Sequence, residues 1–184
     1  FPSDHFDHNN FQLHGKVQAA SECGGDWWGY SKVGNKIIVA IGDVTGHGVS
    51  AALVTAAVHG TFSTLMKQAN CNGAKDFSIE TLLRDLNTSV CASAADQATM
   101  TFVLSQIDLD TGLMRQINAS HRNPYVLSGE RIKPLTDGKC AALGQAHEIQ
   151  AEVSEYQLAP GDIVFWYTDG LLECTNPEGK TINK

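Results

Sequence analysis

The sequence predicts an α+β fold in which two stacked, mostly antiparallel β-sheets are flanked by α-helices, an αββα sandwich. Two observations support this prediction: strand-like apolar runs lie on both sides of a central pair of helical segments, and tight-turn signals separate successive runs. A chain of 184 residues is long enough for one sizeable hydrophobic core and too short for two. We place the domain at residues 11–184 and expect residues 1–10 to be a linker or an expression remnant.

Two strands are expected before the helices. Residues 11–17 alternate apolar and polar side chains, and residues 36–41 form a β-branched run just after the turn signal Val33-Gly34-Asn35. Alternation indicates a half-buried strand, whereas a continuous apolar run indicates a strand buried on both faces.

Two helical segments follow these strands. Residues 49–65 are mostly apolar, which indicates a largely buried helix. Ser78 can cap the second helix, because its hydroxyl precedes apolar residues at helical spacing, which are Ile79, Leu82, Leu83, Leu86 and Val90. We expect no apolar run to approach the roughly 18 to 20 residues that a membrane span needs, and therefore no membrane segment in this chain.

The remaining strands lie after the helices. Residues 99–108 and 113–119 flank Asp110-Thr111-Gly112, a pattern typical of two strands joined by a tight turn. Three further short strands are expected at residues 125–127, 152–158 and 163–167.

Composition narrows the classes of partner and location. The chain has 13 Lys and Arg against 20 Asp and Glu, a net charge of -7. Such a chain has no basic field to hold a phosphate backbone, so we expect no nucleic-acid partner. The five cysteines are far apart and lack zinc-type spacing, which favours a reduced, cytoplasmic setting.

Three aspartates lie where a carboxylate is costly. Asp43 and Asp169 each end an apolar run next to a glycine, and Asp26 lies between two glycines and two tryptophans. A buried carboxylate needs a cation or hydrogen bonds to compensate it. Few basic residues are near in sequence, and oxygen ligands suit Mg²⁺ or Mn²⁺. Taken singly, each aspartate is more typical of a turn, so a metal site requires that the three converge in space.

Six motifs make the sequence similar to a known family. They occur in order, as Glu22 to Trp28, Ile41 to Leu53, Met100 to Gly112, Ala119 to Pro124, Leu158 to Asp162 and Tyr167 to Glu173. Over roughly residues 11–180 the chain resembles the PPM-type metal-dependent serine/threonine phosphatases, in particular their SpoIIE/RsbU branch.

The resemblance implies two Mn²⁺ or Mg²⁺ ions in a cleft at one end of the sandwich. By motif, Asp43 would bridge the two ions and the Val44 carbonyl would bind one of them. Asp26 and Asp169 would complete the metal shell directly or through water, so Asp26, Asp43 and Asp169 are the expected catalytic residues. Glu22 would at most contact these ligands and would not bind a metal ion itself.

The resemblance also implies an activity and a partner. It implies a phosphatase that removes phosphate from phosphoserine or phosphothreonine of a regulatory protein, such as a STAS-type anti-anti-sigma regulator, by a metal-activated water. It leaves a homodimer open. The family pattern continues beyond Tyr167 to Gly170 with a helix and a further metal-ligating strand, so we expect this C-terminal element to be missing from the chain.

Two other functions use the same features. A latent or non-catalytic regulatory module could bind a partner protein through this fold without turnover, which the missing ligand strand favours. A metal-dependent nuclease or small-molecule phosphohydrolase would use the same carboxylates, although the net charge of -7 argues against nucleic acid.

Four other residues have two interpretations each. His47 lies between two glycines and is either a solvated loop residue or a phosphate contact. His121 follows Ala-Ser and precedes Arg-Asn-Pro, where the branch usually has Ala-Gly-His-Asn-Pro-Pro, and we interpret it as a structural hydrogen-bonding residue rather than a ligand. Trp27 and Trp28 either line a groove or place one ring in the core, as strand alternation requires.

Overall fold

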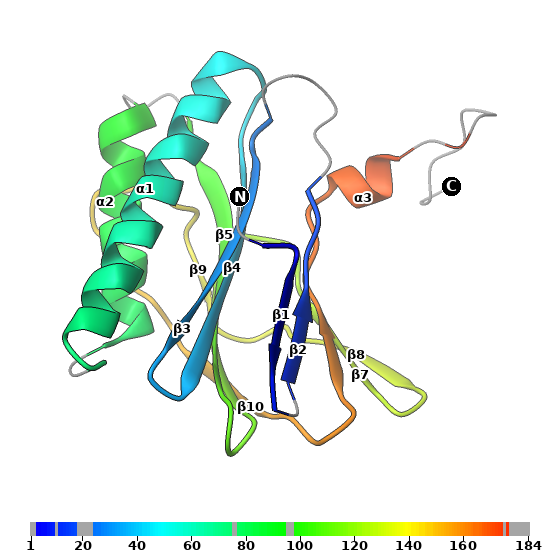
Figure 1. The fold of residues 1–184 in the computed structure, drawn as a ribbon. Helices are drawn as coiled ribbons and strands as arrows, with labels where there is room; N and C mark the ends of the chain where they lie inside the picture. Colours follow the sequence, from blue (N-terminus) through cyan, green and yellow to red (C-terminus); the bar gives the residue numbers. More distant parts are fainter. Residues whose placement is uncertain are drawn as a thin grey trace.

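The computed structural model describes residues 3–9, 11–17, 24–74, 77–94, 98–174 and 176. Figure 1 shows the fold. The strands are β1 (His5–His8), β2 (Phe11–His14), β3 (Asp26–Val33), β4 (Lys36–Val44), β5 (Met100–Asp108), β6 (Leu113–Ala119), β7 (Tyr125–Ser128), β8 (Arg131–Pro134), β9 (Lys139–Cys140), β10 (Ser154–Gln157) and β11 (Ile163–Phe165). The helices are α1 (Val49–Cys71), α2 (Ile79–Ala94) and α3 (Gly170–Glu173).

The large sheet has the strand order β10-β6-β5-β4-β3, with β9 paired to β6. Along this order every neighbouring pair is antiparallel. Helices α1 and α2 cover one face of this sheet (Figure 1). Two smaller sheets, β11-β7-β8 and β1-β2, complete the described part of the fold. The predicted α+β fold with stacked, mostly antiparallel sheets is confirmed.

Alternation along β4 divides the interior into two cores. Ile38 and Ala40 pack with the buried side chains of α1 and α2. Ile37 and Val39 pack in a second cluster, together with side chains of β2, β7 and β11. A strand that is apolar on both faces therefore holds the two layers together, as its continuous apolar run predicted.

Helix α1 is longer than predicted, because it continues through Gly60 to Cys71. Its most apolar window has a mean hydropathy of 1.4, so by length and composition it could cross a membrane, and the expectation that no run is long enough was wrong. One face of α1 packs against β3, β4 and α2, which is the arrangement of a core helix. The second helix begins as predicted, since the Ser78 hydroxyl accepts a 3.3 Å bond from the Thr81 amide.

Several strands were not predicted from the sequence. Strand β3 is buried on both faces, with Trp27 in the helix-side core and Trp28 in the other, so its residues do not alternate in polarity. Strand β8 is exposed along its whole length. Residues 5–8, expected to be part of a linker or an expression remnant, form β1 and pair with β2.

Core packing on the helix side predicts a large difference between two leucines. Leu83 is fully buried in this core, whereas Leu53 is 62% exposed. We expect Leu83→Ala to lower the free energy of unfolding by about 2–5 kcal/mol, because it leaves a cavity. Leu53→Ala is the matched control, with a change within about 0.5 kcal/mol. Urea denaturation followed by circular dichroism measures both, and equal losses would contradict the described packing.

Candidate functional site

Strand register brings polar side chains together at one end of the large sheet. Asp26 pairs with Asp43 across β3 and β4, and Asp43 pairs with Thr101 across β4 and β5. Residues directly opposite each other project to the same face of a sheet. Along β4, Asp43 lies on the same face as Ile37 and Val39, because side chains alternate along a strand. The side chains of Asp26, Asp43 and Thr101 therefore face the second core and the smaller sheets.

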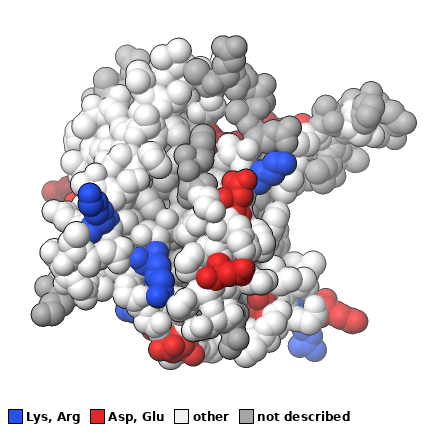
Figure 2. Space-filling view, viewed as in Figure 1, with Lys and Arg blue, Asp and Glu red and all other residues white. Residues whose placement is uncertain are grey.

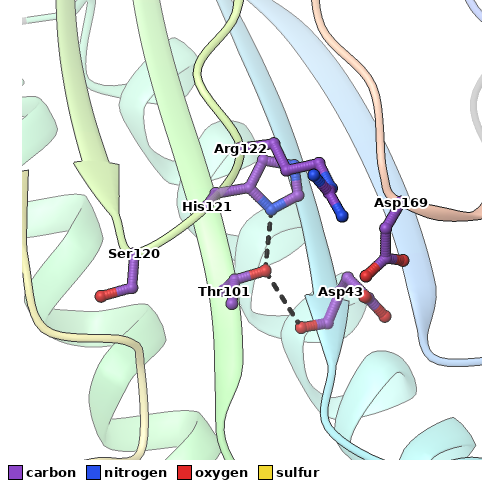
Figure 3. A pocket seen from close by; sticks show the side chains of 6 residues that line it. All are labelled: Asp43, Thr101, Ser120, His121, Arg122 and Asp169. Atoms are coloured by element: carbon purple, nitrogen blue, oxygen red, sulfur yellow. Dashed lines mark hydrogen bonds between the residues drawn. The ribbon is translucent and has the colours of Figure 1, made fainter. Parts of the chain in front are cut away.

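The third aspartate comes from the segment between β11 and α3. Asp169 and Asp43 line one pocket of about 200 Å³, together with Thr101, Ser120, His121 and Arg122 (Figure 3). Asp26 lies beside the same segment, because a Cβ on Gly170 would come within 3.5 Å of its Oδ2 atom. The structure thus brings together the three predicted aspartates, as a metal site requires. Their roles as metal ligands stay predictions.

Burial and mutual repulsion raise the pKa values of two of these carboxyl groups, those of Asp26 and Asp43. Burial is the largest cause for Asp43, and the charges of Asp26 and Asp169 add to it, so its pKa rises to about 6. Burial also raises the pKa of Asp26, against a hydrogen bond from the Thr168 side chain that lowers it. Glu173 adds to the negative charge at both groups. Carboxylates held this close favour a bound cation.

The atoms that could bind a metal at this site are of the kind that a hard divalent ion prefers, but the described ones are not grouped closely enough to form a metal site. They are all oxygen atoms, which Mg²⁺ and Mn²⁺ prefer. In the described part of the chain, the three ion pairs join other residues and leave these aspartates without a cationic partner. However, no three His, Cys, Asp or Glu side chains among the described residues are grouped as a metal site.

Gly25 allows close approach to two predicted ligands. A Cβ there would lie 2.8 Å from the Val44 carbonyl oxygen and 3.3 Å from Asp43 Oδ1. The Val44 amide donates a 3.2 Å bond to the Gly25 carbonyl, which fixes β3 against β4 next to the aspartates. The metal role of the Val44 carbonyl stays a prediction, and Glu22 lies outside the described residues.

His121 connects two parts of the site. Its Nε2 atom lies 3.0 Å from the Tyr167 carbonyl oxygen and its Nδ1 atom lies 2.8 Å from Thr101 Oγ1. A carbonyl can only accept, so Nε2 carries the proton and Nδ1 accepts from the Thr101 hydroxyl. Burial lowers the pKa of His121 to about 4, so the ring is neutral near pH 7. The expectation of a structural hydrogen-bonding residue is confirmed.

The structure also shows site residues that sequence reasoning missed. Thr101, Arg122 and Glu173 lie within the family motifs, but nothing in the sequence singled them out as site residues. Glu173 lies four residues after Asp169 and so on the same helical face. His47 is exposed, between two glycines with positive φ angles, and does not line the pocket. This position favours the solvated-loop interpretation.

Comparison with known proteins gives consistent matches. The family model for stage II sporulation protein E (SpoIIE) matches residues 34–184. Protein IcfG of Synechocystis is 25% identical over 196 residues, covering 93% of this chain and 30% of IcfG. Phosphoserine phosphatase RsbP of Bacillus subtilis is 24% identical over 166 residues, covering 89% of this chain and 40% of RsbP. The chain thus spans less than half the length of these curated relatives.

Solved structures share the fold. The RsbU and RsbW domains of Rv1364c from Mycobacterium tuberculosis superpose with a TM-score of 0.71 at 22% identity, covering 86% of this chain and 43% of that one. RsbX in complex with magnesium superposes with a TM-score of 0.64 at 14% identity, covering 83% of this chain and 69% of that one.

The raised pKa of Asp43 predicts how stability changes with pH in metal-free protein. Its folded-state pKa of about 6 lies above an unfolded value of about 3.9. The folded state therefore binds the proton more tightly, and the stability that this proton confers is lost as pH rises through 6. Asp43→Asn does not titrate, so in EDTA we expect it to be more stable than wild type at about pH 7.5 and to lose this advantage near pH 4.

Urea midpoints across this pH range measure the effect. Asp110→Asn is the matched control, because Asp110 is an exposed turn residue remote in sequence from the three aspartates. A stability difference for Asp43→Asn that does not change with pH would contradict the coupling of the carboxylates.

Proposed function

The chain belongs to the SpoIIE family of PPM-type phosphatases, and on this basis we propose that it hydrolyses phosphoserine or phosphothreonine on a regulatory partner protein. The observation that carries the proposal is the meeting of Asp26, Asp43 and Asp169 at one end of the large sheet. Phosphoserine is favoured by the relative RsbP, which is named a phosphoserine phosphatase.

We propose that Asp26, Asp43, Asp169 and the Val44 carbonyl hold two Mn²⁺ or Mg²⁺ ions. When bound, such ions supply an acidified water and neutralise charge on the phosphoryl oxygens. Support comes from the all-oxygen donor set, from the repulsion that raises the pKa of Asp43, and from the magnesium in the structure of RsbX.

The protein's own residues keep these donors in place. The Thr168 side chain hydrogen-bonds to Asp26 and favours its charged form. Neutral His121 joins Thr101, which is Asp43's neighbour on β5, to the Tyr167 carbonyl two residues before Asp169. Asp43 and Asp169 are far apart in sequence, and the distance between them therefore depends on hydrogen bonds that form without a metal.

The partner is proposed to be a phosphorylated regulator of the STAS type. Figure 2 shows a face on which acidic and basic side chains are interspersed, and the net charge of -7 does not favour nucleic acid. A cytoplasmic location and a homodimer remain part of the proposal. The described cysteines, Cys71, Cys91, Cys140 and Cys174, are free thiols.

A latent regulatory module is the second candidate. It is favoured by one observation, namely that the described carboxylates are not grouped as a metal site. Such a protein would bind its phosphorylated partner without releasing phosphate.

Phosphate release from a phosphoserine protein in the presence of Mn²⁺ tests the proposal. We expect turnover that EDTA abolishes and that Asp43→Asn lowers by orders of magnitude, because Asn removes the charge that would bridge the ions. Asp110→Asn should keep wild-type activity, since that side chain is exposed in a turn. Turnover that resists EDTA would overturn the metal mechanism, and partner binding without turnover would favour the latent module.

A further inference from the structure

Arg122 is the positive charge in a pocket otherwise lined by acidic and neutral side chains. The other lining residues are Asp43, Asp169, Thr101, Ser120 and His121. His121 is neutral, because burial lowers its pKa to about 4. Figure 3 shows the Arg122 side chain extending over the His121 ring toward the side of the pocket where Asp169 and Asp43 lie.

The guanidinium group of Arg122 is available for a ligand. Within the described part of the chain, the arginine ion pairs are those of Arg115, which contacts Glu80 at 2.9 Å and Glu155 at 3.4 Å. Arg122 is exposed at the edge of the pocket, and the described side chains offer it no carboxylate within ion-pair distance. Arg115 thus has a structural role, whereas Arg122 forms no such ion pair with the described residues.

The backbone that carries Arg122 is held firmly. The preceding residue, His121, is bonded through both ring nitrogens, and its amide donates a 2.8 Å bond to Asn118 Oδ1. Two residues later, the Pro124 carbonyl accepts a 2.8 Å bond from the Leu135 amide. The Cα of Arg122 is therefore fixed beside the pocket, while its long side chain can rotate to meet a ligand.

We propose that Arg122 binds the phosphoryl group of the substrate. A guanidinium presents paired N–H donors that match two phosphate oxygens, and this bidentate contact is among the stronger hydrogen-bonded interactions. The inference rests on the proposed phosphatase function but is specific to this chain, because the branch that it resembles usually has Asn at the position after the histidine.

Two variants of Arg122 test the proposal in the full chain loaded with Mn²⁺. Arg122→Gln keeps much of the side-chain length and removes the charge. Arg122→Lys keeps the charge but lacks the paired N–H donors of the guanidinium. Arg131→Gln is the matched control, because Arg131 is exposed on β8 and does not line the pocket. Calorimetry measures the binding of inorganic phosphate and of Mn²⁺ separately, and steady-state kinetics with a phosphoserine protein give KM and kcat.

We expect Arg122→Gln to weaken inorganic phosphate binding and to raise KM about tenfold or more, as expected for a lost charge-assisted hydrogen bond. Arg122→Lys should recover part of this loss, and Mn²⁺ affinity without phosphate should not fall in either variant. Unchanged phosphate affinity in Arg122→Gln, or a loss no greater than in Arg131→Gln, would overturn the proposal. Absence of turnover in wild type would instead refute the phosphatase function, while phosphate binding would still decide the role of Arg122.

Discussion

Repulsion among carboxylates is the constraint on which the site depends. Asp26 and Asp43 are directly opposite on neighbouring antiparallel strands. The Val44 amide bonds to the Gly25 carbonyl, so this neighbouring pair is of the non-hydrogen-bonded kind, whose side chains lie closer together. Like charges in that position destabilise a sheet. The fold tolerates these like charges because β4 is buried on both faces, which fixes its register. A register shift of one residue would move every side chain of β4 to the opposite face and place Asp43 in the helix-side core.

Two hydrogen bonds from consecutive residues attach the Asp169 segment to the large sheet. The Trp166 indole donates a 3.1 Å bond to Ser105 Oγ on β5, and the Tyr167 carbonyl accepts the 3.0 Å bond from His121. Ser105 in turn donates to Gln116 Oε1 on β6 at 3.3 Å. A polar network inside the sandwich therefore determines where the third aspartate lies, while the apolar cores determine the positions of the first two.

Local patterns explain which parts of this arrangement could be predicted. The cap at Ser78 and the turn between β5 and β6 follow from short-range chemistry, and both were confirmed. The extent of strand β3 could not be predicted, because Trp27 and Trp28 are buried on opposite faces and so hide the alternation of a strand. The meeting of the aspartates was expected from the cost of burying carboxylates together with the family motifs. Arg122 was not expected, since its role arises only from tertiary proximity.

The charges around the pocket imply that cation binding and phosphate binding are coupled. Without cations, a phosphate dianion would face the carboxylates of Asp43 and Asp169, with the charges of Asp26 and Glu173 close behind them. One guanidinium at the rim cannot offset four carboxylates, so the phosphoryl group should bind tightly only after cations have neutralised them. Because such coupling is reciprocal, bound phosphate must strengthen cation binding by the same factor. Arg122 would then increase the affinity for phosphate directly, whereas the aspartates would act on it through the cations that they are proposed to hold.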